Sequence, residues 1–445
     1  MAQATRIGWW LGMLGATAGF VAFIVFVAIP PNPQQRTQRM QAQIAKVRGL
    51  QFKRDVVVHE QSQDEFKKQA RSLLGEISAP EQEQVLRTLG LLASDETLDS
   101  DAVRKRLDSD GPAGAYDPYS RRLLIVKAPY QQRHATALDD LYARELYRAL
   151  LDQHFDLKTY LDRRQGGAAL NSDEKLARRI VVESEAFYGA VLRRVKEQTG
   201  QIPKYLPLNQ ALEERFRMEE IMGWGNDPRL REKSGRRKPQ RDPDSVPTFL
   251  AQLLNALQRD GLEFANELRT RGWNEVGKLY TTAPPVSTEQ ILHPQKWFMG
   301  ERPLTIQWPA FESNAAFADW ELVEQDVLGE LMLRAVFRVH YLSPMMGSAP
   351  AGWNGDRYAV FKRRDSGEML LLLYTAWDRE ADAAAFAEAY RVVVKEKYAE
   401  TPKPVRIVEE GRRVVIVEGG EESSLDALMK FALSATEIED TAVER

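Results

Sequence analysis

The sequence predicts an α+β protein that is mostly helical, with an N-terminal transmembrane helix and a small α+β unit near its C-terminal end. Three observations lead to this fold class. Residues 8–29 carry no charged side chain and are long enough, at about 1.5 Å per helical residue, to cross a hydrocarbon core of about 30 Å. Apolar side chains recur at helical spacing through much of residues 60–271. From about residue 355, apolar and polar side chains alternate as they do in strands.

Residues 1–33 form the predicted membrane anchor, which makes the lipid bilayer the expected partner of residues 8–29. The apolar run is longer than that of a cleavable signal peptide, and residues 29–31 offer a poor cleavage site. One face of the helix is nearly bare of side chains, because glycines recur at intervals of four and three, at Gly8, Gly12, Gly15 and Gly19. Such a face allows two helices to approach closely, and the pattern is compatible both with self-association and with none. The polar, glutamine-rich residues 34–54 are predicted to form a juxtamembrane stalk.

The middle of the chain contains a short apolar strand and two long helices. The strand, residues 123–126, follows a turn. The first helix covers residues 135–151, and the second covers about residues 172–197. Asn171, with Glu174 three residues later, has the spacing of a helix cap and predicts where the second helix begins.

Three charged residues lie on the apolar faces of these two helices. Arg144 and Arg148 share a stripe with apolar neighbours on the first helix, and Glu183 does the same on the second. Unpaired charges at such positions would each cost several kcal/mol, so both arginines are predicted to pair with Glu183 between the helices. The alternative is that the arginines extend into a wide cleft and contact only water.

The C-terminal unit is predicted to cover residues 346–433, with a polar, disordered tail at residues 434–445. Its pattern is that of two hairpins and two helices. The expected elements are strands at residues 357–362 and 369–374, a helix at 378–397, strands at 405–408 and 414–418, and a helix at 425–433.

Composition excludes several classes of function. The chain has 445 residues, enough for two or three domains with a sizeable core. Its net charge of -3, with signs mixed along the chain, gives no reason to expect nucleic acid as a partner. It contains no cysteine, which excludes disulfides, thiolate metal ligands and cysteine catalysis. The sequence also lacks a phosphate-binding loop, a nucleophile elbow and a dinucleotide-binding glycine turn.

The first long helix carries the most informative motif, in which Glu145 lies between Arg144 and Arg148. Residues 144–157 resemble the HELTHALQDQHFDL stretch of a family of bacterial, mostly exported or membrane-attached, HExxH zinc metallopeptidase-like proteins. The resemblance covers most of residues 85–360. Its other landmarks are residues 89–92, 114–118, 182–186, 271–273, 284–294 and 352–358.

The resemblance implies a zincin-like, more narrowly gluzincin-like, peptidase body over residues 55–345, as a degenerate member of the family. In an HExxH helix the two histidines bind zinc, and the glutamate takes a proton from the metal-bound water. Both histidine positions carry arginine here, and a guanidinium does not bind zinc. Arg144, Arg148 and the third-ligand position Glu183 are therefore vestigial metal positions, and Glu145 is a vestigial base. We expect no catalytic residue, no metal and no cofactor.

An alternative site would use residues outside this motif. His154 lies ten positions after Arg144, the spacing of a third histidine in metzincins, but the glycine that turns the chain in those sites is missing. A structural role at the end of the helix is therefore the favoured interpretation of His154. His293 lies in a tight Leu-His-Pro turn and is interpreted as bonded to backbone. Together with Glu185, these histidines make up the alternative site.

The predicted function is that of a membrane-anchored, inactive metallopeptidase homologue that acts as a binding or scaffolding protein at the cell envelope. A retained cleft could hold an extended segment of a protein or peptide partner by edge-strand pairing. The first alternative is an active hydrolase with a displaced metal site that uses Glu145, His154, Glu183 or Glu185. The second is a purely structural envelope protein with a closed cleft.

The expected location is that of a single-pass membrane protein. Four positive side chains follow the anchor, and by the positive-inside rule they favour a cytoplasmic body: Arg36, Arg39, Lys46 and Arg48. The family resemblance favours the opposite orientation. Between the two, we expect an extracytoplasmic body.

Overall fold

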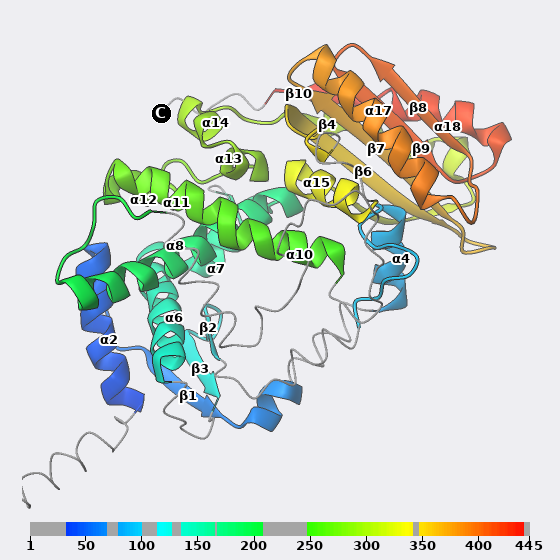
Figure 1. Ribbon diagram of the computed structural model, residues 1–445. Coiled ribbons are helices and arrows are strands. Elements are labelled where there is room, and N and C mark those ends of the chain that lie inside the picture. The colour runs from blue at the N-terminus through cyan, green and yellow to red at the C-terminus, as the bar shows by residue number, and fades with distance from the viewer. Residues whose placement is uncertain are drawn as a thin grey trace, which may run out of the picture.

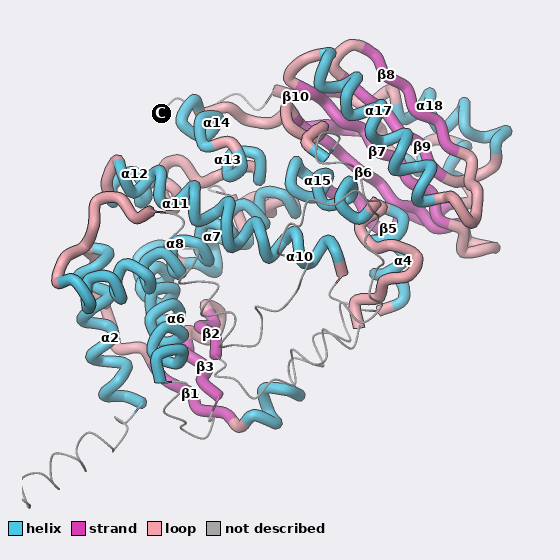
Figure 2. The backbone as a smooth tube through the Cα atoms, viewed as in Figure 1, coloured by secondary structure: helices cyan, strands magenta, loops and turns pink. Residues whose placement is uncertain are grey.

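The computed structural model describes residues 33–68, 79–99, 114–126, 135–164, 167–207, 247–340 and 347–439 (Figure 1). Most described elements before residue 300 form a helical body. Those after residue 304 form a part built around a large sheet (Figure 2). The two parts meet where helices α10 (Thr248–Asn255) and α13 (Thr288–Leu292) pack against helix α15 (Gly329–Val339).

Two long helices, α6 (Ala135–Phe155) and α8 (Ser172–Thr199), pack side by side at the centre of the helical body. Helix α6 is rich in alanine and leucine, which have high helix propensity. Helix α8 begins where the sequence predicts, because the Asn171 side chain accepts a hydrogen bond from the backbone N–H of Glu174. The other helices of the body are α7 (Leu157–Asp162), α10 (Thr248–Asn255), α11 (Gly261–Thr270), α12 (Trp273–Lys278) and α14 (Pro294–Met299), with a π-helical turn at Ala256–Asp260.

Helix α2 (Pro33–Arg48) also belongs to this body, which corrects the predicted stalk at residues 34–54. It packs against α6 and α8 and buries Met40, Ile44 and Val47. These three side chains lie four and three residues apart, so they form one narrow stripe on an otherwise polar helix. The glutamine-rich composition conceals that stripe, and only the contacts with α6 and α8 reveal that it is core.

A three-stranded sheet lies against α6, with the strand order β1-β3-β2. Strand β3 (Arg122–Val126) matches the predicted apolar strand. It pairs in parallel with β1 (Val57–Gln61) and antiparallel with β2 (Gly114–Asp117). Strand β2 is therefore an edge strand, and its free edge faces α6.

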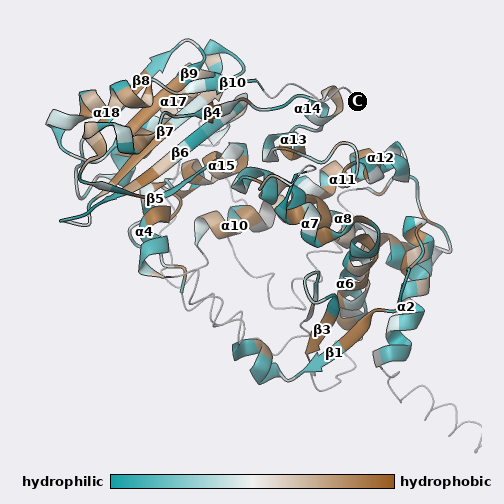
Figure 3. Ribbon diagram, turned by 180° about the vertical axis from the view of Figure 1, so that it is seen from behind, coloured by the Kyte–Doolittle hydropathy of each residue, from teal (hydrophilic) through white to brown (hydrophobic). Residues whose placement is uncertain are grey.

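The C-terminal part is built on a five-stranded antiparallel sheet with the order β5-β6-β7-β9-β8. Every side chain of the central strand β7 is buried, because helices cover both faces of the sheet. One face packs on α15 and α17, and the other packs on α18; Figure 3 shows the apolar strands between these helices. The elements are β5 (Trp320–Asp326), β6 (Trp353–Arg363), β7 (Met369–Trp377), α17 (Glu380–Lys397), β8 (Val405–Glu410), β9 (Arg413–Glu418) and α18 (Leu425–Ala432).

Smaller elements complete this part. Strands β4 (Thr305–Gln307) and β10 (Thr436–Ile438) form a two-stranded antiparallel sheet, so part of the predicted disordered tail is ordered. Helix α4 (Pro80–Thr88) contacts β7, although it comes from early in the chain. The 3-10 turns are Phe311–Ser313, Ala315–Phe317 and Glu422–Ser424.

The predicted fold class, a mostly helical, zincin-like peptidase body with a small C-terminal unit and an N-terminal membrane helix, is wrong. The two predicted hairpins and two predicted helices after residue 355 are present. They belong, however, to a sheet that begins at Trp320, inside the predicted peptidase domain of residues 55–345. The described chain contains several antiparallel strand pairs, so its sheets are a main part of the fold and not a small unit added to a helical domain. Strand β5 was missed because its side chains are mostly polar and do not alternate cleanly.

The predicted single-pass membrane location is also contradicted. None of the helices in the described ranges combines the length and the apolar character needed to cross a membrane. The predicted anchor, residues 8–29, with its glycines Gly8, Gly12, Gly15 and Gly19, lies outside the described residues.

Candidate functional site

Glu145 lies at the centre of the predicted motif, and its carboxylate is fully engaged by the protein. Arg144 Nε lies 2.8 Å from Glu145 Oε1. Arg148 Nη1 lies 3.0 Å from Glu145 Oε2, and the backbone N–H of Tyr116 donates to the same oxygen at 2.9 Å. Tyr116 belongs to edge strand β2, so this bond joins the small sheet to α6. Burial on its own would raise the pKa of Glu145, but Arg144 and Arg148 outweigh it, and the pKa is lower than usual.

The predicted pairing of both arginines with Glu183 holds for one of them. Arg148 Nη2 lies 3.2 Å from Glu183 Oε1 and so joins α6 to α8. Arg144 pairs with Glu145 instead. The Glu183 side chain is 28% exposed, whereas that of Glu145 is completely buried. The buried partner of the two arginines is therefore Glu145. Sequence periodicity missed this because adjacent residues of a helix point in different directions, yet a long arginine side chain can bend back to its neighbour.

Glu185, a member of the alternative site, lies in a separate buried network. Arg48 Nε of α2 lies 2.7 Å from Glu185 Oε1. The hydroxyls of Tyr147 and Tyr280 donate to Glu185 at 3.1 and 2.6 Å. Burial, together with the Glu185 charge, raises the pKa of both tyrosines, which keeps them protonated as donors. The Arg48 guanidinium also lies over the Trp273 ring, 4.5 Å from its centre. Both oxygens of this carboxylate thus accept hydrogen bonds from the protein.

The two histidines of the alternative site lie apart from each other and from Glu185. His154 Nε2 lies 2.8 Å from the backbone oxygen of Gln51, so this histidine braces the end of α6, as the structural interpretation predicts. His293 Nε2 lies 3.1 Å from Glu330 Oε1, so its partner is a side chain and not backbone. The structure does not bring His154, Glu185 and His293 together.

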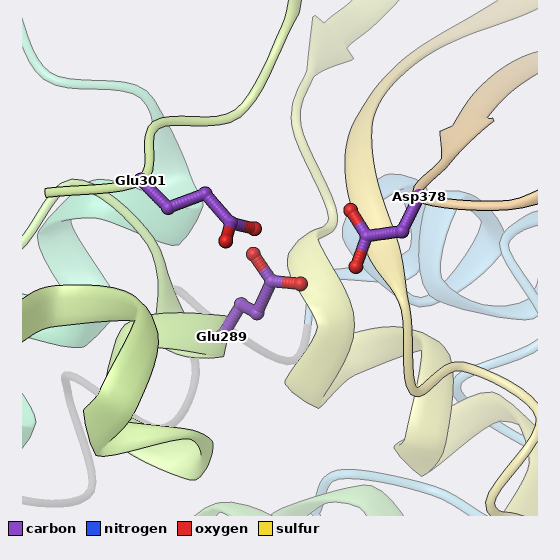
Figure 4. A group of neighbouring side chains, drawn as sticks. All are labelled: Glu289, Glu301 and Asp378. Carbon is purple, nitrogen blue, oxygen red and sulfur yellow. The ribbon is translucent and has the colours of Figure 1, made fainter. Parts of the chain in front are cut away.

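Where the structure describes the chain, the carboxylates close enough together to hold a metal ion are Glu289, Glu301 and Asp378. Figure 4 shows these three side chains pointing toward one another from α13, from the segment after α14 and from the end of β7. The Lys296 ammonium lies among them, 2.6 Å from Glu289, 2.5 Å from Glu301 and 2.7 Å from Asp378. A protein cation thus occupies the position that a metal ion would need.

This lysine cluster carries more negative than positive charge. Burial raises the pKa of Glu289 to about 9, although Lys296 acts in the opposite direction. The surrounding carboxylates raise the pKa of Lys296 and more than offset its burial, so the ammonium stays charged. A proton held by Glu289 therefore reduces the repulsion among the three acids. Glu289 lies in the segment 284–294, where no spacing identifies Lys296 or Asp378 as its partners.

Two further buried carboxylates lie on either side of the junction between the helical body and the sheet. Asp173 accepts hydrogen bonds from the backbone N–H and the hydroxyl of Thr288, the latter at 2.6 Å. Asp356 accepts from the backbone N–H groups of Leu328 and Gly329, each at 2.8 Å. Burial raises the pKa of Asp356 to about 6, although these hydrogen bonds act to lower it. Asp173 and Asp356 thus bind the N-terminal ends of α13 and α15, the helices that pack together at this junction.

Comparison with known proteins assigns no chemistry to any of these groups. Residues 320–429, which span the five-stranded sheet, match the model of a domain of unknown function (DUF8575). No curated protein matches the chain. No solved structure matches it either.

Proposed function

We propose that this protein is a non-hydrolytic binding protein in which the α6–α8 motif has a structural role. The observation that carries the proposal is the state of Glu145. Both of its oxygens accept hydrogen bonds, from two guanidinium groups and one backbone N–H, and its side chain is completely buried.

A general base needs a free oxygen within hydrogen-bonding distance of the water that it activates. Glu145 offers none, and its lowered pKa makes it a weaker base than an ordinary glutamate. The guanidinium groups of Arg144 and Arg148 lie where a metal-dependent hydrolase would need neutral imidazoles. The residues of the displaced-site alternative, Glu145, His154, Glu183 and Glu185, are each engaged by groups of the protein, with Arg148 shared by Glu145 and Glu183.

The same contacts limit how a partner could bind. An extended peptide pairs with backbone N–H and C=O groups along the free edge of a strand. The N–H of Tyr116 on edge strand β2 already donates to Glu145, so this part of the edge offers no donor. We therefore place binding on a surface other than this part of β2. A purely structural protein with a closed cleft would make the same α6–α8 contacts and differs only in having no ligand.

The test is a hydrolysis assay on the purified full chain together with metal analysis. We expect less than one tenth of a zinc ion per chain and no cleavage of a mixed peptide library, with or without added zinc. The Glu145→Gln variant should behave identically in that assay, since no activity depends on the carboxylate. Stoichiometric zinc, or cleavage that a chelator abolishes and Glu145→Gln lacks, would overturn the proposal.

Restoring the histidines is the complementary experiment. Arg144→His with Arg148→His would free Glu145 from both guanidinium groups and create two neutral imidazole ligands one turn apart. Zinc binding by this double variant, but not by the wild type, would support the interpretation that the arginines replaced a metal site.

A further inference from the structure

A cavity of about 650 Å³ opens beside the C-terminal end of α6, away from Glu145 and from the lysine cluster. Its lining includes Arg54, Arg121, Asp152, Phe155 and Tyr280. These residues come from the segment before β1, the turn between β2 and β3, the end of α6 and the segment after α12. Four segments that are distant in sequence thus converge on one polar and aromatic cavity.

The guanidinium groups of both arginines lie near one carboxylate oxygen, but neither donates a hydrogen bond within the described part of the chain. Arg54 Nη2 and Arg121 Nε lie 3.8 and 3.9 Å from the same oxygen, Asp152 Oδ2, which is beyond hydrogen-bonding distance. The buried Asp152 carboxylate already accepts hydrogen bonds from the Tyr116 hydroxyl and from the Leu157 N–H. The Arg54 and Arg121 side chains are 46% and 53% exposed, so their donors are available to a ligand.

The backbone of Arg121 is an independent sign that this side chain is required. Arg121 and Asp156 are the non-glycine residues of the described chain with positive φ, at 57° and 49°. Glycine or asparagine adopts this conformation more readily than any long side chain. Asp156 has a local reason to be there, because its carboxylate accepts a hydrogen bond from Thr159 next to it. Arg121 has only long ion pairs, so its strained position is explained if the guanidinium serves a ligand.

The other residues of the cavity limit the kind of ligand. Phe155 stacks on Tyr280 with ring centres 4.6 Å apart, which offers an apolar shelf beside the arginines. Asp152 offsets part of the positive charge, and so does Asp156, whose Oδ1 lies 3.8 Å from Arg121 Nη2. A cavity with so little excess charge suits a singly charged anion better than a phosphate dianion. Guanidinium groups pair well with the planar carboxylate.

We propose that Arg54 and Arg121 bind the carboxylate of a ligand whose aromatic or other apolar group packs against Phe155. The C-terminal residue of a peptide and a small aromatic acid both have this chemistry. The proposal rests on the proposed binding function and names its ligand class. The two proposals can be tested independently, because neither peptide hydrolysis nor zinc content depends on Arg54 or Arg121.

The test is isothermal titration of the full chain with matched probes. N-acetylphenylalanine carries the carboxylate, and N-acetylphenylalaninamide is the same molecule without the charge. We expect the acid to bind at least tenfold more tightly than the amide and than inorganic phosphate. A hexapeptide ending in phenylalanine should bind more tightly than the single residue if the natural ligand is a peptide end, and equally if it is a small acid. No binding of the acid, or equal binding of acid, amide or phosphate, would overturn the proposal.

Arg121→Gly separates a binding role from a structural one. Glycine relieves the left-handed backbone, so the denaturation midpoint should stay the same or rise, while binding of the acid should weaken at least tenfold. Arg122→Gln removes the same charge from the adjacent exposed residue and should leave binding unchanged. If Arg121→Gly lowered the denaturation midpoint, or left binding of the acid unchanged, Arg121 would have no role in ligand binding.

Discussion

Lys296 Nζ lies 2.7 Å from Asp378 Oδ2, so one ion pair joins helix α14 of the body to the end of strand β7 in the C-terminal sheet. The same ammonium binds Glu289 and Glu301 from its own side of the junction. A single cation thus connects three acids that separate parts of the fold bring together. The pH dependence of stability follows from this arrangement.

Glu289→Gln is expected to flatten the fall in stability between pH 5 and pH 9. Burial raises the folded-state pKa of Glu289 to about 9, from an ordinary value of 4.5, so the folded protein retains a proton that the unfolded chain releases. This contribution to stability is complete below pH 4.5 and is lost as the pH rises toward 9. Urea midpoints at pH 5, 7 and 9 measure it. Glu312→Gln, at an exposed position, is the control, and equal slopes for wild type and Glu289→Gln would contradict the assigned proton.

Glu145→Ala should destabilise the protein far more than Glu183→Ala. Removing Glu145 leaves Arg144 and Arg148 without their buried partner, which costs about 3 to 5 kcal/mol. Glu183 is partly exposed, so water replaces much of its contact with Arg148, and its loss should cost about 1 kcal/mol or less. Guanidinium chloride midpoints of the two variants make the comparison. Similar losses would show that Glu183 is the main partner of the arginines, as the periodicity predicts.

Arg48→Met tests whether α2 is part of the core. The buried pair of Arg48 with Glu185 joins α2 to α8, and its loss leaves a carboxylate without its cation, at a cost of about 3 to 5 kcal/mol. Arg39→Met on the same helix is the matched control, because the Arg39 side chain is 70% exposed and its pair with Glu197 is 3.7 Å long. Its effect should be within about 0.5 kcal/mol. If Arg48→Met and Arg39→Met had equal and small effects, α2 would be a solvated stalk and not part of the core.

Gly329→Ala should destabilise the junction by more than about 1 kcal/mol, since alanine is incompatible with the native backbone there. Gly329 has φ 75°, and a Cβ at this position would lie 1.9 Å from Asp173 Oδ1. Gly277→Ala is the control, because no atom lies within 4 Å of its Cβ position in helix α12. That change should stabilise by about 0.5 to 1 kcal/mol. Thermal midpoints that shift in the same direction would refute the close approach of Gly329 to Asp173.

Local patterns were sufficient to predict many elements. Asn171 and Glu174 mark the start of α8, because a cap depends on residues within one turn. The strand-like segments after residue 355, separated by turn residues, predict the two hairpins, although β7 is buried on both faces and is therefore apolar over its whole length instead of alternating. The inward position of Arg148 follows from helical periodicity alone.

Pairing between distant segments was decided by the tertiary structure. Periodicity shows that a charge faces inward, but not which of several carboxylates meets it, and so Glu145 and not Glu183 is the buried partner. The convergence of Lys296 with Asp378, and of Arg54 with Arg121, joins segments 82 and 67 residues apart, over which no local pattern extends. The sequence by itself determined the positions of the charges and of many helices and strands, but not strand β5. The three-dimensional packing determined which of those charges neutralise one another, because the energy of an ion pair depends on distance and burial and not on separation along the chain.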